Sequence, residues 1–276
     1  MGQYEEKCEK LFHILDEITQ ENTAVAFSGG VDSSLLLKLA CLRAGKQGAS
    51  VYAIAAHTEL HPSGDLEIAE KVAEESGAAF IVLKLRELEE ADIANNPVDR
   101  CYRCKKLLFK EIKRKAEELG AKILVEGTNL DDTKVYRPGL KAIEELAVKS
   151  PLKEAGFTKE DVRKLAAEYG ISVADRPSTP CLATRFPYGA DLSVEKMKKV
   201  EQGEAFLKEL GLYNVRLRIH EETARIEVDE KDMPKLLENR KEVVEFLKGL
   251  GYWYITLDME GFRSGSMDIG IEREEI

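Results

Sequence analysis

Short apolar runs alternate with amphipathic segments over the first two thirds of the 276-residue chain. The runs have the length of buried strands, and the segments between them repeat apolar residues at helical spacing. The expected strands are 23–27, 51–56, 80–83 and 123–125. The expected helices are 4–21, a segment that begins after residue 34, 65–76, 105–119 and 158–169. This alternation predicts an α/β fold, a doubly wound parallel sheet with helices on both faces.

A different order of elements follows residue 190. The expected elements are a helix at 193–210, strands at 215–220 and 224–228, a helix at 233–250 and a strand at 252–257. Together they indicate a small α+β module. A stretch rich in proline and glycine, 175–189, separates the two patterns. We therefore predict two domains, residues 1–185 and residues 186–276.

A glycine-rich loop joins the first expected strand to the next helix. Its sequence is Ser28-Gly29-Gly30-Val31-Asp32-Ser33-Ser34. Such a junction favours an anion, because glycines let a ligand approach the backbone and the first N–H groups of a helix are unpaired. The three serine hydroxyls add donors, and the aspartate could orient the loop or hold a magnesium ion. No lysine follows the glycines, so the loop is not a Walker P-loop; an ordinary glycine turn is the alternative.

The overall charge narrows the range of partners. With 41 basic and 51 acidic residues the net charge is −10, which argues against a broad nucleic-acid surface. No apolar run approaches the roughly 18 residues that a membrane span needs, and the N-terminus lacks a signal-peptide core. We expect a cytoplasmic protein without nucleic-acid or membrane partners. Five cysteines favour thiol chemistry or metal binding over a disulfide framework.

Three of the cysteines stand in polar segments. Cys101 and Cys104 form a Cys-x-x-Cys pair before the helix expected at residue 105, and Cys181 lies in the proline-rich stretch. A lone pair of this kind is ambiguous between zinc, redox chemistry and an iron–sulfur cluster. Three thiolates would suit a four-iron four-sulfur cluster with one iron open to an external ligand. A dithiol pair with Cys181 as nucleophile competes with that interpretation, and a histidine could complete a zinc site.

Further polar residues follow other strands. Gly127, directly after the fourth strand, permits close approach of a ligand, and the acidic residues beside it could bind magnesium or nucleotide. Arg137 could reach a phosphate, although a solvated turn is equally compatible with the sequence. Arg216 and Arg218 point to the same side of an expected strand, where paired guanidinium groups suit a phosphate or a carboxylate. An exposed, solvated strand face is the alternative.

Six segments, in this order, resemble the LarE family of the ATP-pyrophosphatase (PP-loop) superfamily. They are residues 28–34, 96–105, 126–129, 136–139, 150–152 and 181–189. The glycine-rich loop alone specifies the superfamily, whereas the two cysteine-bearing segments are much more specific. The resemblance runs along nearly the whole chain.

The resemblance implies an ATP-dependent sulfurtransferase. It would adenylate the carboxylates of pyridinium-3,5-biscarboxylic acid mononucleotide and convert them to thiocarboxylates, in synthesis of the nickel-pincer nucleotide cofactor of lactate racemase. Magnesium and ATP would bind at Ser28, Gly29, Gly30, Asp32, Ser33, Ser34, Gly127 and Arg137, with Asp32 also counted as catalytic. Substrate contacts would come from Arg185, Arg216, Arg218, Glu204 and Glu227.

The resemblance also bears on the sulfur source. Some family members sacrifice one cysteine at the position of Cys181, whereas others bind a four-iron four-sulfur cluster through three cysteines. Because this chain has Cys101, Cys104 and Cys181, we predict the cluster type, a reusable catalyst fed by a sulfide donor, with zinc as the alternative metal. A homo-oligomer is implied as well.

Two related activities are the alternatives. Iron–sulfur-dependent tRNA thiolases share the loop and the adenylate chemistry, but they generally carry zinc-binding cysteine pairs or RNA-binding domains that this chain lacks. Amidotransferase-type ATP pyrophosphatases give the three cysteines no role.

Overall fold

The computed structural model describes residues 2–62, 64–134, 137–177, 180–263 and 265–269. It divides into two compact units. The first unit comprises Met1–Thr58, Ser63–Ala91 and Cys101–Thr179, and the second comprises Glu59–Pro62, Asp92–Arg100 and Pro180–Ile276. The units part within the predicted proline-rich stretch, shortly before residue 185. Tyr136, Ser178 and Thr179, which belong to segments singled out above, lie outside the described residues.

A parallel sheet in the order β3-β2-β1-β4 forms the centre of the first unit. Its strands are β1 (Thr23–Ala26), β2 (Val51–His57), β3 (Ala79–Lys84) and β4 (Ile123–Val125). This confirms the predicted doubly wound sheet. Because β2 and β4 lie on opposite sides of β1, the carboxyl ends of β1 and β4 flank the switch point where open α/β sheets bind ligands.

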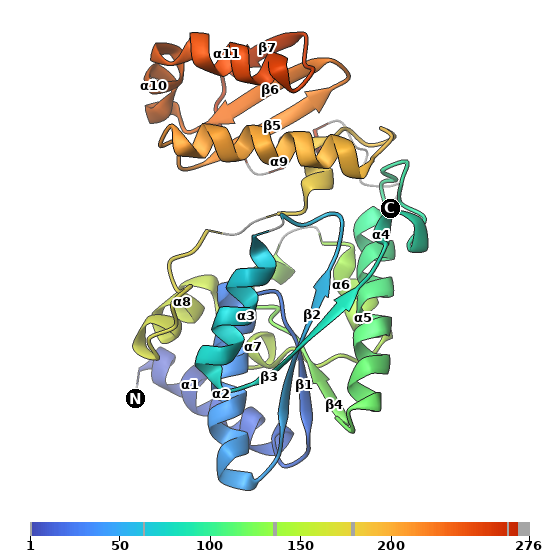
Figure 1. The fold of residues 1–276 in the computed structure, drawn as a ribbon. Coiled ribbons are helices and arrows are strands. Elements are labelled where there is room, and N and C mark those ends of the chain that lie inside the picture. Colours follow the sequence, from blue (N-terminus) through green and yellow to red (C-terminus); the bar gives the residue numbers. More distant parts are fainter. Residues whose placement is uncertain (1, 63, 135–136, 178–179, 264, 270–276) are drawn as a thin grey trace. The chain divides into compact units, whose positions relative to one another are not determined.

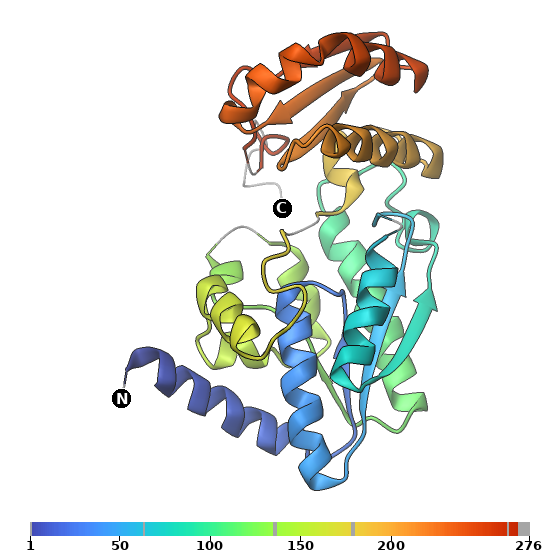
Figure 2. The ribbon, with the colours of Figure 1, turned by 60° about the vertical axis from the view of Figure 1, so that its left-hand side comes forward.

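Helices cover both faces of this sheet (Figure 1). They are α1 (Gln3–Ile18), α2 (Val31–Gln47), α3 (Asp65–Ser76), α4 (Glu87–Glu90), α5 (Arg100–Glu118), α6 (Gly139–Glu145), α7 (Pro151–Glu154) and α8 (Lys159–Glu168), with the 3-10 helix η1 (Asp131–Thr133). Apolar side chains of α1, α2, α3, α7 and α8 bury one face, and those of α5 and α6 bury the other. Figure 2 shows α1, in dark blue, running from the N-terminus to the side of α2.

Local sequence signals set several helix ends. Thr158 and Asp161 form the capping box at the start of α8, as the sequence predicts. Gly77 ends α3 with a left-handed φ of 75°. The prediction that α5 starts at residue 105 is wrong, because the helix begins at Arg100 and includes both Cys101 and Cys104. Neither glycine nor proline interrupts residues 100–119, so the first turn forms around the cysteines.

The second unit is built on a three-stranded mixed sheet, in the order β5-β6-β7. Its elements are η2 (Leu182–Arg185), α9 (Val194–Glu209), β5 (Val215–His220), β6 (Thr223–Val228), η3 (Glu230–Asp232), α10 (Met233–Glu238), α11 (Arg240–Gly249) and β7 (Tyr254–Leu257). This confirms the predicted α+β module. The single helix expected at 233–250 is instead two, which meet at Asn239, a poor helix former.

Helix α9 packs tightly on β5. A Cβ atom at Gly203 would lie 2.6 Å from Cδ2 of Leu217, so a larger residue there would force the leucine side chain to move. Arg216 and Arg218 alternate with Leu217 along β5 and therefore point to its other face. None of the helices in the described residues is long and apolar enough to cross a membrane.

Candidate functional site

The glycine-rich loop, called the PP-loop below (residues 28–34), occupies the predicted junction between β1 and α2. Gly30 is the N-cap of α2, and no side chain caps this helix start. The loop is held instead by its own hydroxyls: Ser28 Oγ lies 3.1 Å from Ser33 Oγ, and Ser33 Oγ donates to the Gly30 carbonyl at 3.1 Å. Ser34 is fully buried, and its hydroxyl has no partner among the described residues. An uncapped helix start behind a glycine turn is an anion site.

Asp32, in the first turn of α2, faces the segment that follows β4. Its Oδ1 accepts a hydrogen bond from Asn129 Nδ2 at 3.0 Å, and its Oδ2 pairs with the ammonium group of Lys159. Asp32 therefore sits between two donors from different elements, with part of its carboxylate exposed. The sequence does not predict this role for Lys159, because no local pattern indicates that the start of α8 lies beside the PP-loop.

Two glycines fit the PP-loop into its surroundings. Gly29 has a φ of 69°, and a Cβ there would lie 2.9 Å from Cα of Ala69 in α3. A Cβ at Gly127 would lie 2.9 Å from the backbone nitrogen of Ser33. The close approach expected at Gly127 thus involves the PP-loop itself, which packs directly on the turn after β4.

The acidic residues that follow β4 make hydrogen bonds and ion pairs within the first unit. Glu126 is buried and accepts hydrogen bonds from Thr128 and from Ser150. Asp132 accepts from the backbone of Asn129 at 3.1 Å and pairs with Arg137 at 2.9 Å. These contacts shape the edge of the site and hold Arg137, half-exposed, against it. Among the predicted nucleotide-binding residues, the structure places the PP-loop, Gly127 and Arg137 at one edge of one sheet.

The five cysteines fall into two groups. Cys8 and Cys41 pack against the core of the first unit, and burial raises the pKa of both thiols, to about 11 for Cys41. Cys101 is exposed and Cys104 half-buried, one turn apart on α5. The thiol of Cys104 donates to the carboxylate of Glu87 at 3.1 Å, and Glu87 is fully buried. Cys181, half-buried, precedes η2 in the second unit.

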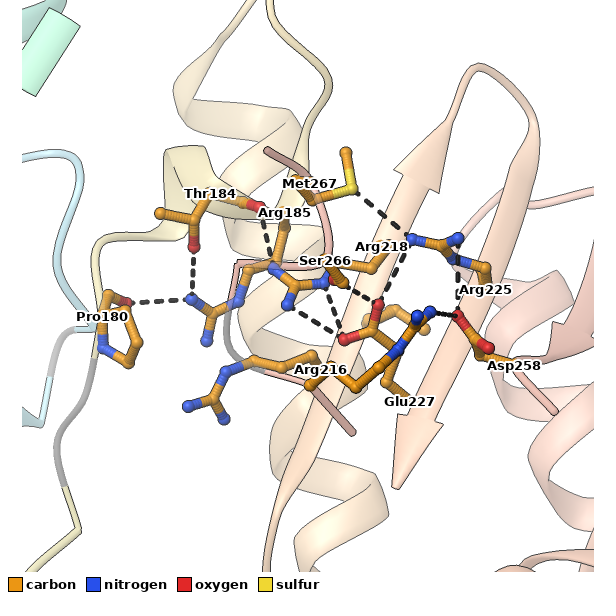
Figure 3. A network of polar contacts seen from close by, with 12 residues as sticks. Pro180, Thr184, Arg185, Arg216, Arg218, Arg225, Glu227, Asp258, Ser266 and Met267 are labelled. Atoms are coloured by element: carbon orange, nitrogen blue, oxygen red, sulfur yellow. Dashed lines mark hydrogen bonds and ion pairs between the residues drawn. The ribbon is translucent and has the colours of Figure 1, made fainter. Parts of the chain in front are cut away.

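Four of the predicted substrate residues lie in two buried ion pairs of the second unit, and Figure 3 shows the pair between Arg218 and Glu227. Arg185 is 1% exposed and pairs with both oxygens of Glu204. Arg218 pairs with Glu227 at 2.9 Å, and Glu227 also accepts from Ser266 at 2.6 Å. Burial opposes ionisation of Glu204, but the hydrogen bonds and charge of Arg185, together with the Leu217 N–H, outweigh it and hold the pKa of the carboxyl below the usual range. Both carboxylates are thus paired with an arginine.

Arg216 differs from its neighbours. Its guanidinium lies apart from the dashed contacts in Figure 3 and rests 5.1 Å from the ring centroid of Phe262. Among the described residues, it donates to the carbonyl of Val215 at 2.8 Å. Within the described residues, no carboxylate lies within ion-pair distance of it. Burial lowers the pKa of Arg216 to about 10, and the charges of Arg185 and Arg218 add to this effect. An anion bound here would relieve the unfavourable environment of this cation.

The donor sets fit the implied ligands in kind. A magnesium ion is usually held by one or two carboxylates together with substrate phosphates, which matches the position of Asp32 in the PP-loop. Thiols are the ligands of iron–sulfur clusters, and Cys101 and Cys104 share one helix face. In the described part of the chain, no three His, Cys, Asp or Glu side chains converge on a metal position.

Comparison with known proteins identifies the family of the chain. A model of the PP-loop domain matches residues 3–134. The chain is 36% identical over 256 residues to the pyridinium-3,5-bisthiocarboxylic acid mononucleotide synthase of Lactiplantibacillus plantarum, which covers 93% of this chain and 92% of that protein. This chain belongs to the LarE family. Its similarity to that synthase includes both units, so the PP-loop and the arginine-bearing sheet are both within the matched length.

Two other relatives differ in how much of the chain they match. An uncharacterized protein of Synechocystis is 34% identical over 266 residues, which cover 96% of this chain and 97% of that protein. The tRNA-specific 2-thiouridylase of Rickettsia bellii is 28% identical over 197 residues, but these cover only 58% of this chain and 53% of that enzyme. The likeness to LarE is therefore both closer and longer than the likeness to the tRNA enzyme.

Proposed function

We propose that this LarE-family protein is an ATP-dependent sulfurtransferase that makes pyridinium-3,5-bisthiocarboxylic acid mononucleotide from the corresponding biscarboxylic acid. The product is a precursor of the nickel-pincer nucleotide. The observation that carries the proposal is the 36% identity to the synthase along 93% of the chain. The PP-loop with Asp32, and the guanidinium of Arg216, which has no carboxylate partner among the described residues, would supply the two chemical features that the reaction needs.

The first half-reaction is adenylation of a carboxylate. One carboxylate oxygen attacks the α-phosphorus of ATP, the bond to the β-phosphate oxygen breaks, and pyrophosphate leaves. The uncapped start of α2 and the hydroxyls of Ser28 and Ser33 would stabilise the charge that develops on the departing pyrophosphate. Asp32 would hold the magnesium ion, whose charge assists the same step. Lys159, now paired with Asp32, would then be available to a phosphate oxygen.

The second half-reaction transfers sulfur. A sulfur nucleophile attacks the carbonyl carbon of the acyl-adenylate and AMP leaves, so one thiocarboxylate forms per ATP and two rounds complete the product. We propose that Cys101, Cys104 and Cys181 hold a four-iron four-sulfur cluster, which would carry the transferred sulfide when bound. The other residues of this chain would bind and orient the substrate and keep its anionic groups paired.

Arg216 is the residue we propose for direct contact with a substrate phosphate or carboxylate. Its guanidinium is partly exposed, lacks a carboxylate partner among the described residues and carries five donors. Arg218, Glu204 and Glu227 would act nearby in the same unit. A sulfide donor and a homo-oligomer complete the proposal. Exposed Trp253 and Tyr254, at the edge strand β7, are compatible with a contact between copies.

Pyrophosphate release tests the proposal. The purified protein is incubated with ATP, magnesium and the pyridinium biscarboxylate, and pyrophosphate and AMP are measured against a reaction without the pyridinium compound. The proposal predicts release that depends on this substrate and falls sharply in Asp32→Asn. Release that depends instead on tRNA, with none on the pyridinium compound, would favour a tRNA thiolase.

A further inference from the structure

A single buried guanidinium links Cys181 to the core of the second unit. On one side, Arg185 Nε and Nη2 donate to the two oxygens of Glu204 at 2.8 and 2.9 Å. Glu204 comes from α9 and also accepts from the backbone nitrogen of Leu217 at 3.0 Å. Gly203, the neighbour of Glu204, lies against the side chain of Leu217 on β5. The guanidinium is thus fixed in position and orientation by a helix and a strand.

The other side of the guanidinium holds the backbone around Cys181. Arg185 Nη1 donates to the carbonyl of Pro180 at 3.0 Å, to the carbonyl of Cys181 at 3.2 Å and to Thr184 Oγ1 at 2.9 Å. These two carbonyls belong to the peptide groups on either side of the Cys181 Cα atom. Thr184 adds two bonds to the Cys181 carbonyl, from its hydroxyl at 2.7 Å and from its backbone nitrogen at 3.1 Å. Hydrogen bonds therefore hold the peptide groups on both sides of Cys181.

A second buried pair holds the far end of the same turn. Arg218 Nη1 donates to the carbonyl of Thr184 at 2.9 Å, while its Nε and Nη2 contact Glu227. The backbone nitrogen of Leu182 donates to the carbonyl of Leu60 at 2.8 Å. Residues 180–185 are thus held by polar contacts with α9, β5 and residue 60, and the two arginine–glutamate pairs at the centre of these contacts are buried.

The energetics of such pairs favour a role in geometry. Removing two charges from water costs free energy that their mutual attraction returns only in part, so a hydrophobic replacement is often as stable. What a guanidinium supplies is a rigid planar set of donors, and here it joins one carboxylate to two carbonyls and a hydroxyl. A lysine keeps the charge but has no fixed fork with which to make both sets of bonds. This distinction makes the role of Arg185 testable.

We propose that the Arg185–Glu204 pair is a positioning device that fixes the backbone of Cys181, and that Arg185 acts through Cys181 and makes no contact with substrate. This inference rests on the proposed function for its link to sulfur transfer. Its geometric part, the effect of Arg185 on Cys181, can be tested without any substrate. Thr184 belongs to the same device as the hydroxyl that bridges the guanidinium and the Cys181 carbonyl.

The first test measures the Cys181 thiol alone. Metal-free protein is treated with iodoacetamide, and alkylation of Cys181 and Cys101 is followed by peptide mass spectrometry. In Arg185→Lys, we expect Cys181 to react about threefold faster or more, because its turn opens more often. The rate at Cys101, in the same sample, should be unchanged. Arg263→Lys is the matched control, since Arg263 pairs with Asp258 in the same unit and, among the described residues, contacts neither Arg185 nor Cys181.

The second test separates the two half-reactions. Arg185→Lys should leave substrate-dependent pyrophosphate release and the KM for the pyridinium compound within about twofold of wild type. Sulfur transfer should fall by roughly 10- to 100-fold, because the misplaced sulfur ligand or nucleophile no longer meets the adenylate. A raised KM together with an unchanged Cys181 alkylation rate would overturn the proposal and make Arg185 a substrate-binding residue.

Variants of Thr184 test the same positioning role if Arg185→Lys does not fold. Thr184→Val removes the bridging hydroxyl at nearly constant shape, whereas Thr184→Ser keeps it. The proposal predicts faster alkylation of Cys181 and slower sulfur transfer in the valine variant, with both restored in the serine variant. Equal behaviour of the two variants would contradict it. If wild-type protein releases no pyrophosphate with the pyridinium compound, the proposed function fails, and the alkylation rates alone still decide the positioning role.

Discussion

Asn129 donates a hydrogen bond to Asp32 at 3.0 Å across 97 residues of sequence. This bond joins the turn after β4 to the PP-loop after β1, at the switch point of the sheet. It fixes one oxygen of the carboxylate that we assign to magnesium, and Lys159 occupies the other. We expect Asn129→Ala to slow substrate-dependent pyrophosphate release by about tenfold, and Asp32→Asn by about 100-fold or more. Lys134→Ala is the control, because the Lys134 ammonium pairs with Asp131 at the surface and, among the described residues, makes no hydrogen bond or ion pair with Asp32 or Asn129. A wild-type rate in Asp32→Asn would remove this residue from the mechanism.

Gly127 gives a second prediction at the same edge. An alanine there would place its Cβ 2.9 Å from the backbone nitrogen of Ser33, and neither atom can move without a shift of the backbone that carries it. The PP-loop must shift, so we expect Gly127→Ala to raise the KM for ATP about tenfold or more. The control is Gly45→Ala in the last turn of α2, where nothing lies within 4 Å of the added Cβ. It should leave the KM unchanged and stabilise the helix by about 0.5–1 kcal/mol. An unchanged KM in Gly127→Ala would show that the contact is not needed.

Arg216 gives a third prediction, on substrate affinity. Arg216→Gln removes a cation that has no carboxylate partner among the described residues. We therefore expect the KM for the pyridinium compound to rise about tenfold or more, with little change in the rate at saturation. A KM in Arg216→Gln equal to the wild-type value would place the substrate anion elsewhere.

Asp161 gives a prediction about stability. Burial opposes ionisation of this carboxyl, but the hydrogen bonds from Lys7 and Thr158 hold its pKa below the ordinary value of 3.8. A group with a lowered folded pKa stabilises fully above its unfolded pKa, and this contribution disappears as the pH falls through the folded value. We expect Asp161→Asn to lower the free energy of unfolding by about 1–2 kcal/mol at pH 7.

The difference between wild type and Asp161→Asn should shrink as the pH falls below 3.8. Unfolding in urea at several pH values measures it. Glu160→Gln serves as the control, since Glu160 is an exposed residue of the same helical turn. A difference that stays constant with pH would assign the effect to packing instead of charge.

The sequence predicts elements better than it predicts contacts. The four parallel strands and the capping box at Thr158 follow from apolar runs and local capping chemistry, which depend on neighbouring residues only. The start of α5 was misplaced because Cys101 and Cys104 interrupt the apolar periodicity without breaking the helix. A local pattern of this kind carries no signal for the position at which the backbone turns helical.

The contacts of the candidate site are even less predictable from local sequence than the helix boundaries are. Alternation along β5 predicts that Arg216 and Arg218 share a face, and the register of the strand confirms it. Nothing local distinguishes Arg218, which is neutralised by Glu227, from Arg216, which has no carboxylate beside it among the described residues. The pairing of Lys159 with Asp32 and of Arg185 with Glu204 likewise arises only when distant segments are folded together. Tertiary packing therefore decides which of several arginines remains available to a substrate.

The most direct test of the central claim counts sulfur atoms. The protein is reconstituted anaerobically with iron and sulfide, then supplied with ATP, magnesium, sulfide and the pyridinium biscarboxylate, and the thiocarboxylate product is quantified by mass spectrometry. We predict product with both carboxylates converted, one AMP for each sulfur transferred, and many more than two sulfur atoms per chain. Product without turnover, accompanied by conversion of Cys181 to dehydroalanine, would contradict the catalytic cluster. No sulfur in the pyridinium compound would contradict the proposed function itself.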